Sequence, residues 1–194
     1  QYMFNSLQLN LGNNKYHNVS HQLNMAKTDW SWAGLIFDYN LDGNEDIFVT
    51  NGYRKYGSDN DSRIKINQTK IEYNNRVPIE TKRRLYNELP SEKLSNLLYK
   101  NEGNLIFKEV GEQSNILEPS FSNGAAYADL DNDGDLEIIV NNIDDNAFIY
   151  KNLSVENNLG NFLKVELKGN LSENFAKGTI CLLYTSDAAD DKQC

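Results

Sequence analysis

Two short acidic segments constrain this chain more than any other feature of its sequence. Residues 129–137 contain five acids and a glycine and lead directly into the apolar run 138–140. Residues 38–46 repeat the pattern ahead of the apolar run 47–49. Carboxylates at this density repel one another unless a cation lies among them. Oxygen ligands at positions 1, 3 and 5, with glycine at position 6 for a sharp turn, are what calcium requires, so each segment predicts a calcium loop.

The spacing of the acids excludes the loop that joins two helices. An EF-hand needs a bidentate glutamate at position 12, but that position is Val49 in the first segment and Val140 in the second. The last acid stands at position 9 instead, which indicates a compact loop between two strands. The predicted ligands are positions 1, 3, 5, 7 (through its carbonyl) and 9 of each loop: Asp38, Asn40, Asp42, Asn44, Asp46, Asp129, Asp131, Asp133, Asp135 and Glu137.

The two predicted sites differ in charge. The second loop has four charged side-chain ligands, whereas the first has three because Asn40 stands at position 3. We therefore expect the second loop to bind calcium more tightly, with both dissociation constants about 10⁻⁴–10⁻³ M. The alternative is a pair of metal-free acidic turns, but an Asp-Gly turn by itself needs no further oxygen ligands at alternating positions.

The composition agrees with metal binding and excludes several other classes. The 194 residues carry a net charge of -9, and the two loops together contain nine acids. This balance argues against a nucleic-acid partner, whose phosphates would be repelled. No apolar run reaches the ~18 residues of a transmembrane helix. Cys181 and Cys194 suggest neither a disulfide framework nor a zinc site, and Gln1 suggests an internal piece of a longer chain.

An internal repeat links the two loops. A shift of 91 residues superposes them and aligns 7–13 with 98–104 without a gap. A third partial copy, 148–152, resembles 97–101 at an offset of 51 residues. The first unit therefore carries an insertion of about 40 residues, near 53–93. The underlying period of 51 is typical of propeller blades or β arrays.

Each unit predicts four short strands, rich in β-branched and aromatic residues and bounded by Asn and Gly. The strands expected in the first unit are 35–37, 47–50, 96–99 and 105–109. Those expected in the second are 125–128, 136–141 and 147–151, with a fourth beyond them. Tight hairpin turns are expected at 12–14 and 103–104.

The insertion differs from the repeats. Residues 57–62 have loop composition, and Pro78 favours a helix that Pro90 would stop, with Ile79 and Leu85 on its apolar face. A binding role and simple decoration suit this segment equally well. The expected fold class is all-β: a partial β-propeller of four-stranded blades with calcium loops, an α-helical insertion in one blade and the start of a C-terminal β domain.

The motifs resemble those of FG-GAP/VCBS repeat proteins, whose blades carry D-x-D-x-D-G-x-x-D loops, as in the integrin α-subunit propeller. More narrowly, the chain resembles bacterial proteins that join such repeats to a C-terminal ASPIC/UnbV domain. The matching segments are 28–33, 49–54, 123–129, 140–142 and, for the opening of the ASPIC/UnbV segment, 161–169. Asn40 and Glu137 depart from the acids usual at positions 3 and 9. The resemblance implies a propeller, an extracellular, cell-surface or periplasmic location, and no established catalysis.

The repeat and the resemblance together predict how the chain is divided. Residues 1–27 would end a preceding blade, 28–120 would form a blade with its insertion at 53–93, and 121–158 would form the next. Residues 159–180 would begin the ASPIC/UnbV-like segment. Residues 181–194 resemble a translated sequencing adapter and are excluded from the fold argument.

The expected function is a calcium-binding extracellular scaffold for polysaccharide or protein, not an enzyme. The alternatives are a non-catalytic part of a propeller-type glycan-degrading enzyme and a purely structural array. No motif pairs a nucleophile with a base, and His17 and His21 lie on a predicted strand and loop that do not favour a shared ion. Trp30 and Trp32 could stack on sugar rings, but packing in the core between sheets is the favoured interpretation.

Overall fold

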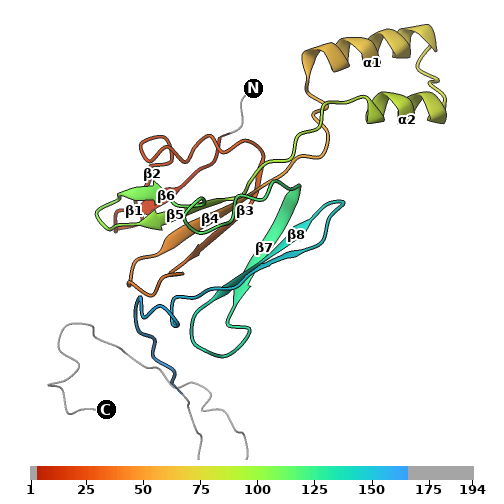
Figure 1. Ribbon diagram of the computed structural model, residues 1–194. Helices are drawn as coiled ribbons and strands as arrows, with labels where there is room; N and C mark the ends of the chain where they lie inside the picture. The colour runs from red at the N-terminus through yellow and green to blue at the C-terminus, as the bar shows by residue number, and fades with distance from the viewer. Residues whose placement is uncertain (1–3, 166–194) are drawn as a thin grey trace, which may run out of the picture. The chain divides into compact units, whose positions relative to one another are not determined.

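The strands fall into three antiparallel sheets (Figure 1). The structure, a computed structural model, describes residues 4–165. Its strands are β1 (Gln8–Asn10), β2 (Tyr16–Asn18), β3 (Ser31–Phe37), β4 (Asp46–Asn51), β5 (Leu97–Asn101), β6 (Phe107–Glu109), β7 (Ser122–Ala128), β8 (Glu137–Asn142) and β9 (Phe148–Tyr150). Two helices, α1 (Asn60–Glu72) and α2 (Ile79–Asn87), lie between β4 and β5 in the chain. The described residues are mostly β in organisation, as the sequence predicts.

Part of the predicted organisation falls beyond this range. Residues 181–194, the adapter-like segment, lie outside the described residues, as does the ASPIC/UnbV-like segment from residue 166 onward. The fold described below belongs to the unit Gln1–Phe162. Within residues 4–165, no helix combines the length and the apolar composition needed to cross a bilayer.

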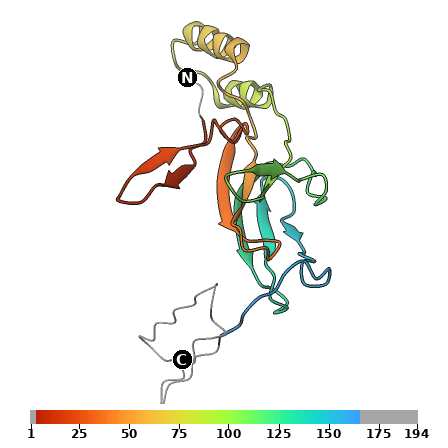
Figure 2. The same ribbon diagram turned by 90° about the vertical axis from the view of Figure 1, so that its left-hand side faces the viewer.

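The sheet β3-β4-β5-β6 is a meander in which strands consecutive in sequence are neighbours in the sheet. This is the four-stranded unit predicted for the first repeat. Figure 2 shows β1 and β2 as a separate hairpin. Gly12 at φ +78° and Gly103 at φ +80° supply the left-handed backbone that the β1–β2 and β5–β6 turns need. Both hairpins stand where the sequence predicts them.

The two larger sheets are copies of one unit. β7 begins 91 residues after β3, and β8 begins 91 residues after β4. The register repeats as well, since Ile47 pairs with Tyr99 in the first sheet and Ile138 pairs with Tyr150 in the second. The sequence repeat is therefore also a repeat of strand order and pairing.

The second sheet differs from the first at its outer edge. It contains β7-β8-β9, and residues 151–165 contain no strand, so the prediction of a fourth strand is wrong for this part of the chain. Ser154 takes the place that Gly103 holds in the first sheet, and it lacks the freedom of glycine at positive φ. Asn152 accepts a hydrogen bond from the backbone N–H of Ser154, as Asn101 does from Gly103, and a further one from Leu153.

β4 is buried on both faces because its side chains alternate between two apolar cores. Ile47 and Val49 pack with Met25 and Tyr99 on one face. Phe48 points to the other core, where the two larger sheets meet. The buried members of that core are Phe37, Phe48, Leu98, Ile116, Ile138 and Val140.

The helices contribute little to either core. α1 has no buried residue, and Leu85 is the buried residue of α2, so the apolar face predicted for that helix is largely exposed. α2 begins directly after Pro78, close to the predicted start. The loop predicted at 57–62 is confirmed for residues 57–59 and wrong for residues 60–62, because α1 begins at Asn60. Asp59 caps it by accepting a hydrogen bond from the backbone N–H of Ser62 at 2.9 Å, and residues that favour turns also favour helix caps.

Candidate metal centre

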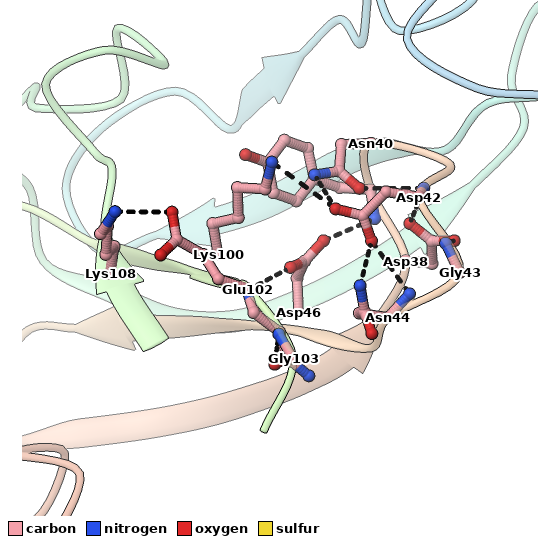
Figure 3. Close-up of polar contacts among 12 residues, drawn as sticks. Asp38, Asn40, Asp42, Gly43, Asn44, Asp46, Lys100, Glu102, Gly103 and Lys108 are labelled. Atoms are coloured by element: carbon pink, nitrogen blue, oxygen red, sulfur yellow. Dashed lines mark hydrogen bonds and ion pairs between the residues drawn. The ribbon is translucent and has the colours of Figure 1, made fainter. Parts of the chain in front are cut away.

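The acidic segments connect β3 to β4 and β7 to β8, so each joins two neighbouring antiparallel strands, as predicted. In the first loop, the Asp38 carboxylate accepts hydrogen bonds from the backbone N–H groups of Asp42, at 3.1 Å, and Gly43, at 2.8 Å. Gly43 has φ +85°, a conformation that glycine adopts without steric cost. Figure 3 shows the polar side chains of this loop gathered around the turn.

The ninth residue of the first loop, Asp46, is a buried carboxylate that ties the loop to β5. Its two oxygens accept hydrogen bonds from the backbone N–H of Tyr39, at 3.2 Å, and of Asn101, at 2.7 Å. Burial raises the pKa of Asp46 to about 6, although these two donors act in the opposite direction. The side chain predicted as a metal ligand therefore also holds three segments of the backbone together.

The second loop repeats this arrangement with a glutamate. Glu137 is 3% exposed and accepts hydrogen bonds from the backbone N–H of Leu130, at 2.8 Å, and of Asn152, at 3.4 Å. Leu130 follows Tyr39 by the same 91 residues, and Asn152 follows Asn101 by 51. The longer side chain at position 9 thus preserves the link between the loop and the third strand of the sheet.

Two asparagines complete these links, and the sequence reasoning missed both. The side-chain amide of Asn101 donates to the carbonyl of Glu45 at 3.0 Å, and that of Asn152 donates to the carbonyl of Leu136 at 3.2 Å. The sequence feature that could have revealed these two asparagines is the tripeptide Tyr-Lys-Asn, which occurs at 99–101 and again at 150–152. It is a repeated element of the site as well as a strand pattern.

Asp42, at position 5 of the first loop, has several internal partners. It accepts hydrogen bonds from the side-chain amides of Asn40 and Asn44, each at 2.9 Å, and the ammonium of Lys100 lies 3.5 Å away. Burial raises the pKa of Asp42, but the hydrogen bonds and the charge of Lys100 outweigh it and hold the pKa below its ordinary value. The carboxylate of Asp42 is therefore compensated within the chain.

The acids of the second loop converge on one another. Carboxylate oxygens of Asp129, Asp131 and Glu137 lie within 4.8 Å of one another. The Oδ1 atom of Asp129 is buried and has no hydrogen-bond partner among the described residues. A carboxylate oxygen left without a partner is costly unless a positive group compensates it. Positions 1, 3 and 9 of this loop thus fit a hard cation such as calcium.

Positions 5 and 7 of the second loop lie in a neighbouring group. Carboxylate oxygens of Asp133, Asp135 and Glu156 are within 4.8 Å of one another. The backbone N–H of Asp135 lowers the pKa of Asp133, but desolvation and the surrounding acids leave that pKa raised. Lys151 lies 3.1 Å from both Asp131 and Glu156, and these acids raise the pKa of its ammonium. Lys151 and Glu156 were not predicted, because both lie outside the acidic segment.

The predicted ligands of the two loops are therefore brought together to different degrees. In the residues that the structure describes, both groups of three converging acids include acids of the second loop. In the first loop, the side chains of Asn40 and Asn44 turn to Asp42 as hydrogen-bond donors. This difference agrees with the order of affinity expected from charge alone, which stays a prediction.

An aromatic group formed by Trp30, Trp32, Tyr53 and Tyr56 lies apart from the acidic loops in the sequence. Trp30 stacks on Tyr53 with ring centroids 4.1 Å apart, and Trp32 is 52% exposed. The favoured interpretation of the tryptophans as core residues is wrong, because neither is buried. Exposed and partly buried residues alternate along β3, and Trp32 lies on the exposed face of the strand.

A scan against protein-family models, a search of curated proteins and a search of solved structures each found no match to this chain.

Proposed function

We propose that this chain is a calcium-binding repeat module of a β-propeller of the FG-GAP/VCBS kind, and that it serves as a binding scaffold for polysaccharide or protein. The observation that carries the proposal is the repeated loop. In both larger sheets an acidic loop joins the first two strands, and its ninth residue accepts hydrogen bonds from the same two backbone positions. Equivalent acids therefore stand at the same position in both repeat units.

Apolar side chains on the outer faces of the sheets support the propeller. Ile139 pairs with Ile149, and both lie on the face of β8 and β9 opposite to Ile138 and Val140. Ile149 is 64% exposed. A further blade packed on this face would bury it in the way that the second sheet buries one face of β4.

The role proposed for calcium is structural. Bound ions would neutralise the acids and hold each loop against the strands that it connects, which stabilises the folded form by mass action. Affinities of about 10⁻⁴–10⁻³ M suit extracellular calcium modules. An extracellular, cell-surface or periplasmic location is therefore part of the proposal.

The aromatic group supports a glycan as ligand. Partly exposed aromatic rings offer flat apolar faces together with polar edges, and sugar rings present the complementary C–H faces and hydroxyls. A hollow of about 280 Å³ opens beside Trp32, and its lining residues include Ser6, Ser20 and Ser31 as well as apolar residues. Apolar walls with a few polar groups are typical of ligand sites.

The proposed function is tested by applying the chain to a glycan array with calcium and again with a chelator. Binding that needs calcium supports a calcium-dependent glycan scaffold. Equal binding under both conditions contradicts the coupling of calcium to function. Release of new reducing ends from a bound glycan would favour the glycan-degrading alternative, and no binding on any array would favour a protein ligand or a structural array.

We expect Trp32→Ala to weaken glycan binding about tenfold, since a central tryptophan typically contributes more than 1 kcal/mol at an interface. Trp32 is 52% exposed and its indole N–H donates a hydrogen bond to the carbonyl of Gly52, so the free energy of unfolding should fall by about 1 kcal/mol. Tyr16→Ala, which removes another exposed aromatic ring, is the matched control and should bind as wild type does. Equal affinities for the two variants would exclude the aromatic group as the glycan site.

A further inference from the structure

The second acidic group of the second loop is formed by Asp133, Asp135 and Glu156, whose carboxylate oxygens lie within 4.8 Å of one another. Glu156 comes from the turn after β9 and belongs to no part of the acidic segment. Glu156 is exposed and Asp133 is partly buried, whereas Asp135 is fully buried, so water screens the repulsion least at Asp135. A compensating positive charge is therefore favoured most beside Asp135.

Asp135 provides an independent sign of a ligand. Its side chain is fully buried, and its Oδ2 atom accepts a hydrogen bond from the backbone N–H of Val155 at 3.0 Å. Its Oδ1 atom is also buried and has no hydrogen-bond partner among the described residues. Because burial of an unpaired carboxylate oxygen is expensive, a native fold rarely leaves one without a cation or a donor beside it.

Lys151 does not meet this need by itself. Its ammonium contacts Asp131 in one acidic group and Glu156 in the other, each at 3.1 Å. The two groups contain six carboxylates, so the charge that remains beside one ammonium is −5. One divalent ion would leave an excess of negative charge, whereas two would bring the site close to neutrality.

The first loop shows that these acids are not required by the blade itself. At the offsets of 91 and 51 residues, Asn44 corresponds to Asp135 and Leu105 corresponds to Glu156. The first loop makes the same link to the third strand through Asp46 without either acid. Asp135 and Glu156 are therefore additions to the shared arrangement, and the hydrogen bond from Val155 occupies only one oxygen of Asp135.

We propose that the second loop holds an additional divalent cation, bound by Asp133, Asp135 and Glu156, beside the ion assigned to Asp129, Asp131 and Glu137. Ligands that are all carboxylate oxygens favour a hard cation, and calcium is the one proposed for this loop. This inference rests on the proposed function because both ions occupy one loop. The second loop would then bind one ion more than the first.

The test is the number of calcium ions bound by the chain of 194 residues, measured by equilibrium dialysis against radioactive calcium. Glu156→Gln should bind one ion fewer than wild type. Glu112→Gln, which alters an exposed glutamate elsewhere, is the matched control and should bind as many ions as wild type. Asp129→Asn combined with Glu156→Gln should lose one more ion than Glu156→Gln alone, which separates the two sites.

Equal ion numbers for wild type and Glu156→Gln would overturn the additional site and leave the proposed function standing. Absence of bound calcium in wild type would instead overturn the proposed function. Circular dichroism of each variant guards against misfolding, since loss of an ion with an unchanged spectrum supports a ligand role. Loss of the ion with loss of the β spectrum would make Glu156 a residue needed for folding and would contradict the proposal.

Discussion

Replacing Asp46 with alanine is expected to lower the free energy of unfolding by about 2–4 kcal/mol, since each buried backbone donor left unpaired costs about 1–3 kcal/mol. Asp46 is fully buried, and its oxygens accept the backbone N–H groups of Tyr39 and Asn101. Its loss would free the loop from β5 at the same time. Urea unfolding in the presence of a chelator measures the change without a contribution from calcium.

Glu45→Ala is the matched control, because Glu45 is the exposed neighbour of Asp46. Its free energy of unfolding should stay within about 0.5 kcal/mol of wild type. Asp46→Asn should fall between the two variants, since it keeps one acceptor oxygen and removes a charge that burial disfavours. If Asp46→Ala unfolds at the same urea concentration as Glu45→Ala, the carboxylate does not hold the loop.

Calcium is expected to stabilise the folded chain by about 2.7 kcal/mol at about 10 mM free ion, if the tighter site has a dissociation constant of about 10⁻⁴ M. The physical reason is that the ion binds converging acids that exist together only in the folded state. Thermal unfolding followed by circular dichroism should show a midpoint about 5–11 °C higher than in a chelator.

Magnesium at the same concentration provides the control for ionic strength. It demands a smaller octahedral site and releases its water reluctantly, so the midpoint should move much less than with calcium. Asp129→Asn, which removes a member of the converging group, should reduce the calcium effect. Equal shifts with both ions would indicate general screening of charge in place of a built site.

Much of the fold could be predicted because the sequence repeat corresponds to a repeat of strands. The 91-residue offset placed β3, β4, β7 and β8, and the glycines of the hairpin turns marked the smaller strands. The prediction of a fourth strand in the second sheet was wrong because Ser154 stands where the β5–β6 turn of the first sheet has a glycine at positive φ. α1 was missed because the capping residue Asp59 lies in a segment with the composition of a loop.

The candidate site could be predicted only as far as it is local in sequence. The order of acids within each loop located the segments, but the partners of Asp46 and Glu137 come from strands that the loop does not contain. Glu156 joins Asp133 and Asp135 through the fold of the turn after β9. No pattern within the acidic segment contains that contact, so the division of the acids into two groups needed the structure.

The most direct test of the calcium loops is calorimetric titration of calcium into wild type, Asp38→Asn and Asp129→Asn. We predict that wild type binds calcium, that Asp129→Asn loses the tighter binding, and that Asp38→Asn loses the weaker binding. The converging acids of the second loop are the reason for this order. Absence of binding in wild type, or equal or reversed affinities in the two variants, would contradict the account.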